Sequence, residues 1–378
     1  MSTFCDYYNK GQCRSCQIIE LSYTDQLKQK EQEVQSAFPN FSALLPSVQS
    51  APQNFRHRAK FVVTGKKDSP IIGLAGEEEL DSGRELLDCP LHHPSINKLT
   101  HMLPDFIKTA GLTPYNIKDR SGELKGIIIF SNYSATQMYL KFILRSKESL
   151  DRIKKHQTRL LLIMPELKLI SANIQPIPHA ILEGEEEIVL TTDQYIWHNF
   201  KSTRMLVGTN GFIQTNPVVA EVLYSRAAEW IQEFNHQKMV ELYCGYGAFS
   251  FFAQKYLKQS VGIEINASSI EVANLTKQKL ALTNMTFIQG PADGVQSILE
   301  QESPDLILVN PPRRGLASAT DLIKNSSCRG LIYSSCSLET LKKDIENLKG
   351  SFELKKVQVF DMFPHTKHFE VLTYLERL

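Results

Sequence analysis

Hydrophobic and polar positions follow two patterns along the chain, and the change falls near residue 205. Before that point, short apolar runs are separated by Gly, Pro, Asn or charged residues, as in "RAKFVVTG", "PIIGLAG", "GIIIFSN", "QMYLKFILRS", "LKLISANIQP" and "EEEIVLT". Runs of this length between turn-forming residues indicate strands. The pattern predicts a β-rich α+β architecture, with a central domain over residues 93–205.

Helical and strand-like stretches alternate from residue 217 onward. The stretch "PVVAEVLYSRAAEWIQEF" has apolar residues at helical spacing after a first-turn proline, and "KMVELYCGYGAFSFFAQKY" indicates a strand, a glycine-containing turn and a helix. Further strands are predicted in "SVGIEIN", "MTFIQGPA", "PDLILVNPPRRG", "RGLIYSSCS" and "HFEVLTYLERL". This alternation predicts an α/β, Rossmann-like domain over residues 206–378, with ligands at the carboxyl ends of parallel strands.

The N-terminal segment, residues 1–92, contains a predicted polar helix and clustered cysteines in addition to the first two strand-like runs. Residues 21–36, "LSYTDQLKQKEQEVQS", are predicted to form a short surface helix. Cys5, Cys13 and Cys16 have C-x7-C-x2-C spacing, and Cys89 is the natural fourth ligand because the proline after it holds the backbone extended. Four thiolates suit either zinc or an iron–sulfur cluster, and the spacing does not decide between them.

Composition and charge narrow the cellular setting and the partners. The 378 residues are 42% hydrophobic, enough for two or three domains with buried cores. Neither a secretory leader nor an apolar run of membrane-spanning length is present in the sequence, so we expect a cytoplasmic protein without a membrane partner. The net charge of +1 gives no overall attraction to phosphate, so any RNA contact requires local basic clusters such as "FRHRAKF", "IKDRSGELK" and "LRSKESLDRIKK".

The first turn of the predicted α/β domain favours a nucleoside cofactor without phosphates. "ELYCGYGAF" has only two glycines, Gly245 and Gly247, and thus lacks the dinucleotide-binding pattern. Glu264 follows Gly245 by nineteen residues, at the end of the next strand. A carboxylate there can accept hydrogen bonds from both ribose hydroxyls while the glycines let the backbone approach the ligand. S-adenosylmethionine fits these features best.

Two further motifs predict chemistry at a ring carbon. Asn310 lies between a buried strand and two prolines, an arrangement similar to the base-holding signature of nucleic-acid methyltransferases. Enzymes that methylate exocyclic amines have an aromatic residue after the prolines, whereas this chain has Arg313. Methylating uracil C5 requires a thiolate to add first to C6, and Cys336 ends the following strand. Glu370 is the predicted base for the C5 proton, and Cys328 is predicted to be structural.

Taken together, "GFIQTNP", "ELYCGYGAF", "GIEIN", "NPPRRG", "YSSC" and "FDMFPHTKHFEVL" resemble the bacterial RNA 5-methyluridine methyltransferase family over essentially the whole chain. The resemblance implies methyl transfer from S-adenosylmethionine to C5 of a uridine in 23S ribosomal RNA. We expect a monomer, although the sequence does not give the oligomeric state. The resemblance assigns a 4Fe-4S cluster to the four cysteines. The site residues that it implies are, for the cofactor, Gln214, Tyr243, Gly245, Glu264 and Asn310; for the base, Phe212 and Asn310; for the chemistry, Cys336 and Glu370.

The chain departs from many relatives of that family at two points. Relatives often begin with a small β-barrel RNA-binding domain, for which Cys5 leaves no room, so the central β-rich domain is expected to position the RNA. Relatives often have aspartate at the position of Asn310. An amide accepts a hydrogen bond from uracil N3–H and donates one to O4, so it remains compatible with uracil, and whether it serves the base or the cofactor stays open.

Three alternative functions compete with this prediction. A 5-methylcytosine enzyme would also use a cysteine at C6, but the Pro-Cys motif of that family is absent from the sequence. An inactive RNA-binding or zinc-ribbon protein would require neither Cys336 nor Glu370. Another ribosomal RNA site, or a transfer RNA, stays open because nucleotide choice depends on loop shape and basic surface.

Overall fold

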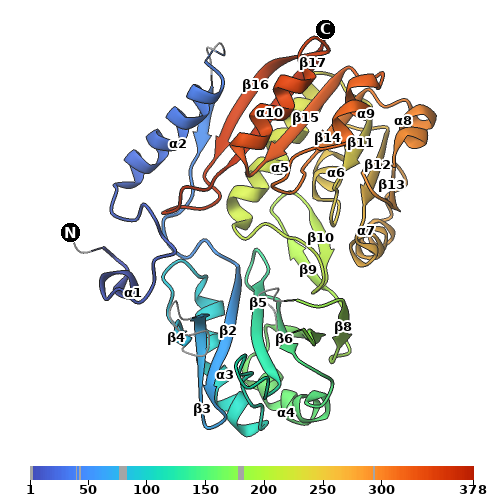
Figure 1. The fold of residues 1–378 in the computed structure, drawn as a ribbon. Coiled ribbons are helices and arrows are strands. Elements are labelled where there is room, and N and C mark those ends of the chain that lie inside the picture. The colour runs from blue at the N-terminus through green and yellow to red at the C-terminus, as the bar shows by residue number, and fades with distance from the viewer. Residues whose placement is uncertain (1–2, 40, 42–43, 76–82, 178–182, 293) are drawn as a thin grey trace. The chain divides into compact units, whose positions relative to one another are not determined.

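Contacts within the chain divide it into two units (Figure 1). The computed structural model describes residues 3–39, 41, 44–75, 83–177, 183–292 and 294–378. The first unit comprises Met1–Cys16 and Gln53–Asn199, and the second comprises Gln17–Pro52 and Phe200–Leu378. This division differs from the three predicted segments because residues 17–52 pack with the C-terminal part of the chain, where Val34 and Phe38 enter its hydrophobic core.

The first unit contains a seven-stranded sheet in the order β4-β3-β2-β5-β6-β7-β8. Apolar side chains of α3, among them Leu99 and Leu103, share one core with the sheet. The elements are α1 (Asp6–Asn9), β2 (Arg58–Lys66), β3 (Ser69–Ala75), β4 (Gly83–Glu85), α3 (Pro94–Thr109), β5 (Leu124–Ser131), β6 (Met138–Leu144), α4 (Leu150–Ile163), β7 (Leu167–Ile174), β8 (Glu186–Val189) and β9 (Ile196–Asn199). Strands β2, β3, β5, β6, β7 and β8 coincide with the predicted runs, whereas β4, β9, α3 and α4 were not predicted.

The second unit contains an eight-stranded sheet in the order β1-β16-β17-β15-β14-β11-β12-β13, with helices on both of its faces (Figure 1). Its elements are α2 (Tyr23–Ala37), β1 (Leu45–Val48), β10 (Arg204–Val207), α5 (Pro217–Glu233), β11 (Lys238–Leu242), α6 (Ala248–Ala253), β12 (Gln259–Glu264), α7 (Ala267–Lys279), β13 (Met285–Gln289), α8 (Gln296–Glu302), β14 (Leu306–Val309), α9 (Ala319–Asn325), β15 (Gly330–Ser335), α10 (Leu338–Leu348), β16 (Phe352–Phe360) and β17 (Glu370–Arg377). The α/β fold predicted for this region is confirmed.

The strand order of the second sheet places a ligand crevice at a defined point. Strand β11 pairs in parallel with both β12 and β14, so the direction of winding reverses there. In open α/β sheets, ligands bind outside the carboxyl ends of the strands at this switch point. Strand β17 runs antiparallel to β15, with Ser335 opposite Val371. The start of β17 therefore lies at the same edge of the sheet as the end of β15.

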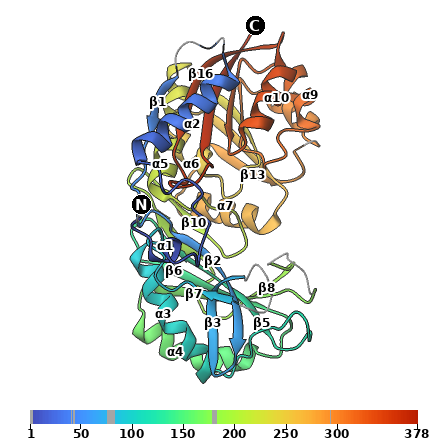
Figure 2. The same cartoon turned by 60° about the vertical axis from the view of Figure 1, so that its left-hand side comes forward.

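Helix α2 has a buried side that the polar sequence concealed. It runs beside β1 and β16 (Figure 2), and Gln26, Lys30 and Val34 on it are buried. The prediction of a surface helix is thus wrong for this side, because two polar side chains reach partners inside the unit. Among the described residues, the helices are all too short or too polar to cross a membrane.

Candidate active site

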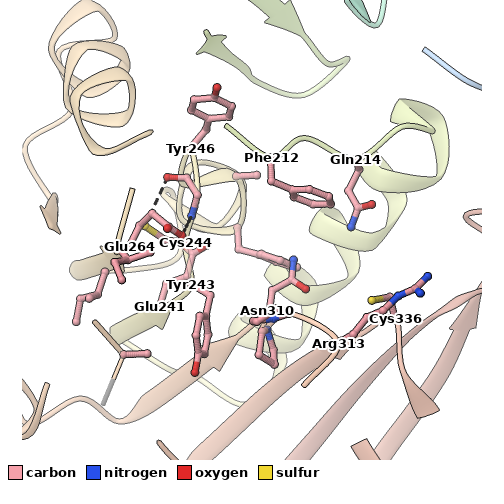
Figure 3. Close-up of a pocket in the computed structure, with 18 of the residues that line it drawn as sticks. Phe212, Gln214, Glu241, Tyr243, Cys244, Tyr246, Glu264, Asn310, Arg313 and Cys336 are labelled. Carbon is pink, nitrogen blue, oxygen red and sulfur yellow. Dashed lines mark hydrogen bonds between the residues drawn. The ribbon is translucent and has the colours of Figure 1, made fainter. Parts of the chain in front are cut away.

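A cavity of about 790 Å³ lies at the carboxyl ends of the central strands of the second unit (Figure 3). Residues of β11 and β12, the residues directly after β14 and β15, and the first residue of β17 contribute to its lining. The cavity is lined by Phe212, Gln214, Tyr243, Gly245, Glu264, Asn310, Cys336 and Glu370. Side chains from distant parts of the sequence are thus brought to one place, where a cofactor and a substrate can meet.

The turn after β11 shapes one end of the cavity. The backbone N–H groups of Gly245 and Asn266 donate to the two oxygens of the Glu264 carboxylate, at 3.2 and 2.9 Å. Gly245 has a φ of +53°, and no atom lies within 4 Å of the position that a Cβ would take there. The backbone therefore presents open space beside an oriented carboxylate, as a ribose-binding site requires.

Glu241 is a cavity residue that the sequence analysis did not single out. It is buried on β11 and accepts hydrogen bonds from the Ser250 N–H at 3.0 Å and the Ser250 hydroxyl at 2.5 Å. Burial raises the pKa of its carboxyl to about 7, although the two hydrogen bonds oppose this shift. An acid within the apolar run "MVEL" was the available signal, because charged residues are rarely buried without a partner.

The loop before α5 supplies the predicted base-stacking residue. The Phe212 side chain is 63% exposed although it is aromatic, and Gln214 beside it is buried. Figure 3 shows both side chains at the cavity. Asn216 caps α5 by accepting from the Val219 N–H at 3.3 Å, which fixes the end of this loop. An exposed aromatic ring on an anchored loop offers a free face for stacking a base.

Cys336 follows β15 and lies beside the Arg313 side chain (Figure 3). Burial raises the pKa of the Cys336 thiol, and the negative charge of Glu370 adds to this shift. The positive charge of Arg313 and a hydrogen bond from its side chain lower it. Arg313, noted in the sequence only as a departure from an aromatic residue, is therefore the group that favours the thiolate.

Substituting Arg313 tests this electrostatic arrangement. We expect Arg313→Ala to raise the pKa of the Cys336 thiol and to slow its alkylation by iodoacetamide about tenfold near neutral pH. The measurement is the pH profile of alkylation at Cys336, read by mass spectrometry. Arg314→Ala serves as the control, since it removes the neighbouring arginine. An identical profile for Arg313→Ala and the unmodified chain would contradict the role of this guanidinium.

The turn that carries Arg313 is fixed by a buried acid. Asp344 on α10 accepts hydrogen bonds from the Tyr333 hydroxyl at 2.7 Å and from the Leu316 N–H at 2.9 Å. Gly315 has a φ of +76°, and a Cβ there would lie 2.5 Å from an Asp344 carboxylate oxygen. Glycine is therefore required at this position for the turn to approach Asp344 closely. In the sequence, Asp344 is indistinguishable from an exposed helical acid.

Glu370 is buried at the start of β17 and lines the same cavity as Cys336. The Ser334 hydroxyl donates to its carboxylate at 2.7 Å. Burial raises the pKa of Glu370 to about 7, with the hydrogen bond acting in the opposite direction. A carboxyl with such a pKa can accept and release a proton near neutral pH, which is the property required of a general base.

The predicted cysteine ligands lie in the first unit. Cys5 and Cys16 are buried, Cys13 and Cys89 are half-buried, and all four are free thiols. Burial raises the pKa of Cys16 to about 12, and the charges of Cys89, Cys13 and Cys5 add to this shift, so these three thiols lie within electrostatic range of Cys16. Within the described residues, however, no group of three or more His, Cys, Asp or Glu side chains is arranged to hold a metal ion.

Comparison with known proteins agrees with this geometry. A family profile described as tRNA (Uracil-5-)-methyltransferase matches residues 193–378. The 23S rRNA (uracil(747)-C(5))-methyltransferase RlmC of Actinobacillus pleuropneumoniae serotype 5b is 40% identical over 386 residues, covering 98% of both chains. The chain belongs to the RNA (uracil-C5)-methyltransferase family.

Other matches to this family extend over nearly the whole chain. RlmC of Escherichia fergusonii is 40% identical over 375 residues, which cover 98% of this chain and 99% of the relative. The crystal structure of Pyrococcus abyssi tRNA (uracil-54, C5)-methyltransferase in complex with S-adenosyl-L-homocysteine has a TM-score of 0.79 and 21% identity. It covers 96% of this chain and 85% of its own, and it shows that the fold is shared. Membership of an S-adenosylmethionine-dependent RNA methyltransferase family, predicted from the motifs, is confirmed.

Proposed function

We propose that this protein transfers a methyl group from S-adenosylmethionine to C5 of a uridine in 23S ribosomal RNA, at the position numbered 747 in the names of its relatives. The observation that carries the proposal is the cavity shared by Cys336, Glu370 and Glu264. A nucleophile, a base and a ribose-binding carboxylate in one site satisfy the requirements of this reaction. The relatives of similar length supply the choice of RNA.

The proposed reaction begins at Cys336, whose thiolate is favoured by Arg313. Its sulfur forms a bond to C6 of uracil, and the C5–C6 electron pair moves toward O4 to give an enolate. Bound S-adenosylmethionine would supply an electrophilic methyl group: C5 would form a bond to this methyl while the bond between the methyl and the sulfonium sulfur breaks, and S-adenosylhomocysteine would leave. Glu370 next removes the proton from C5, the C5–C6 double bond re-forms, and the bond between C6 and the sulfur breaks.

Different residues of the cavity are assigned to the two substrates. Glu264 would accept the ribose hydroxyls of S-adenosylmethionine beside Gly245, with Tyr243 and Gln214 completing that pocket. Phe212 would stack on the flipped uracil, since its ring is exposed at the cavity. We assign Asn310 to the uracil edge, where its amide both accepts from N3–H and donates to O4.

RNA outside the target base is assigned to basic residues of the first unit. The second unit offers a cavity for one nucleotide, so the phosphate contacts that dominate RNA affinity must lie elsewhere. Helix α4 is rich in such residues, with Arg152, Lys154, Lys155 and Arg159 against a single acid, Asp151. We further propose that the protein acts as a monomer in the cytoplasm, where its ribosomal RNA substrate is found.

We also propose that Cys5, Cys13, Cys16 and Cys89 hold a 4Fe-4S cluster. Support comes from the neighbourhood of four free thiols and from Arg56, whose positive charge lies close to Cys16 and Cys89. A cluster with four thiolates carries net negative charge, which a nearby arginine offsets. The four sulfurs would bind the cluster in their thiolate form. We assign the cluster no part in the methyl transfer.

Metal content distinguishes this cluster from zinc or from free thiols. We expect protein purified without oxygen to be brown, with about four irons per chain and a broad absorbance in the visible range. Cys16→Ser should lose the iron and the colour, whereas Cys328→Ser should retain both. Colourless protein with one zinc per chain, or with no metal, would contradict the cluster.

The proposed function is tested by mapping the product. Purified protein and methyl-labelled S-adenosylmethionine are incubated with unmodified 23S ribosomal RNA, with 16S ribosomal RNA and with bulk transfer RNA. We expect 5-methyluridine in 23S ribosomal RNA at a single position. Label in transfer RNA alone would overturn the substrate choice but not the chemistry, and label in 5-methylcytosine would overturn the chemistry itself.

A further inference from the structure

We infer that helix α2 positions the loop that carries the proton acceptor, so that Gln26 and Lys30 are positioning residues of the reaction. The inference rests on the proposed function of Glu370. The loop comprises residues 361–369 and connects β16 to β17, which begins at Glu370. Its residues Phe363 and His368 line the cavity. Displacement of this loop would therefore move both the cavity wall and the base.

Lys30 anchors the start of the loop. Its ammonium group donates to the Asp361 carboxylate at 2.6 Å and to the Phe363 carbonyl at 3.2 Å. The side chains of this ion pair are only 2% and 0% exposed. A buried ion pair stabilises the fold little by itself. Separating its two partners is costly, however, because each would be left as an uncompensated buried charge. The pair thus fixes where Asp361 lies relative to α2.

Gln26 anchors the middle of the loop through both ends of its amide. Its side-chain oxygen accepts from the His365 N–H at 2.8 Å, and its nitrogen lies 3.2 Å from His365 Nδ1. The other ring nitrogen of His365 lies 2.7 Å from the Pro52 carbonyl oxygen. His365 has a φ of +66°, a strained conformation for a residue with a side chain. These contacts hold the strained residue in place.

The two halves of α2 have different partners. The C-terminal half contributes Val34 to the hydrophobic core, which accounts for the attachment of the helix to the second unit. The N-terminal half contributes buried polar groups, and Gln26 and Lys30 make polar contacts with three loop residues: Asp361, Phe363 and His365. Apolar side chains at positions 26 and 30 would be enough to attach α2 to the second unit. The buried polar contacts instead specify the conformation of the loop, and misplacement of a base by about 1 Å can cost 10²-fold in rate.

The same helix provides matched controls for a test. Gln26→Ala is compared with Gln29→Ala, and Lys30→Met with Lys28→Met, since Gln29 and Lys28 are exposed. Two quantities are measured for each variant: amide hydrogen exchange of residues 361–369 by mass spectrometry, and the kinetics of methylation with the fraction of covalent protein–RNA adduct. Should Lys30→Met fail to fold, Gln26→Ala carries the test, because it leaves no buried charge unpaired.

We expect exchange in the loop to rise at least fivefold in Gln26→Ala and Lys30→Met but not in the controls. The turnover rate should fall about tenfold with accumulation of adduct, while KM for S-adenosylmethionine stays within about twofold. Unchanged exchange in the loop, or equal losses in variants and controls, would overturn the inference. Absence of methylation and adduct in the unmodified chain would instead refute the proposed function, and the exchange measurement separates the two failures.

Discussion

Replacing Cys336 by alanine is expected to abolish 5-methyluridine formation, with a loss of roughly 10⁴-fold or more. Without the thiolate, C5 of uracil is too weak a nucleophile to attack the methyl group, however well both substrates are bound. Affinity for S-adenosylhomocysteine should stay within about twofold, because the residues that we propose bind the cofactor include Gly245 and Glu264 and do not include Cys336. The measurement combines nucleotide mapping of the RNA with calorimetric titration of the cofactor product.

Cys328→Ala is the matched control for this substitution. Cys328 is buried in the core of the same unit, where its sulfur accepts from the Ser326 hydroxyl at 3.1 Å, and it does not line the cavity. Its loss should lower stability slightly and leave the modification in place. Full 5-methyluridine in ribosomal RNA from cells that depend on the Cys336→Ala protein would refute the covalent mechanism.

Glu370→Gln is expected to trap the protein on its RNA. The thiolate can still add to C6 and C5 can still accept the methyl group, but the C5 proton is no longer removed. Loss of a positioned base slows a reaction by about 10²–10⁴-fold. A covalent complex should therefore persist in denaturing gels, in contrast to Glu376→Gln, which changes a half-buried acid on the same strand outside the cavity. A variant that turns over normally, or one that never forms a complex, would exclude Glu370 as the base.

The raised pKa of Glu370 gives this prediction a pH dependence. The carboxyl accepts a proton only when ionised, so breakdown of the adduct should accelerate as pH rises through about 7 and then level off. The effect on stability has the opposite sign. The pKa of Glu370 in the folded state, about 7, exceeds its ordinary value of 4.5. Between these two pH values the native state binds more protons than the unfolded state, so Glu370 destabilises the fold increasingly as pH rises. Glu370→Gln should consequently be no less stable than the unmodified chain at pH 8.

The sequence pointed to Cys336, Asn310 and Glu264 because each ends or directly follows a recognisable strand. A run such as "LILVNPP" or "LIYSSC" fixes where a buried strand ends, and parallel strands bring their carboxyl ends to one edge. The position of Glu370 was harder to predict from the sequence, because this residue begins a strand. It reaches the same edge only because β17 is antiparallel to β15, and the periodicity of a single strand does not specify its direction.

The helices α3 and α4 and the polar contacts show where local reasoning failed. Helix α3 begins with Pro94 after a capping His93, a signal that was present but not used. The sequence pattern gave no sign that Gln26, Lys30 and Asp344 are buried. In the sequence, a buried polar residue looks the same as an exposed one, and only its partner in the fold distinguishes it. Those partners, His365, Asp361 and Tyr333, are supplied by other elements of the fold.

The sequence by itself determined the α/β class of the C-terminal part, the β-rich character of the preceding part and the family. These follow from hydrophobic periodicity and short motifs, which are local properties of the chain. Tertiary structure decided that residues 17–52 join the C-terminal unit, that Arg313 lies beside Cys336, and that Glu370 is buried with a pKa of about 7. These features depend on which side chains meet and how much water is excluded, and both are set only when distant segments pack together.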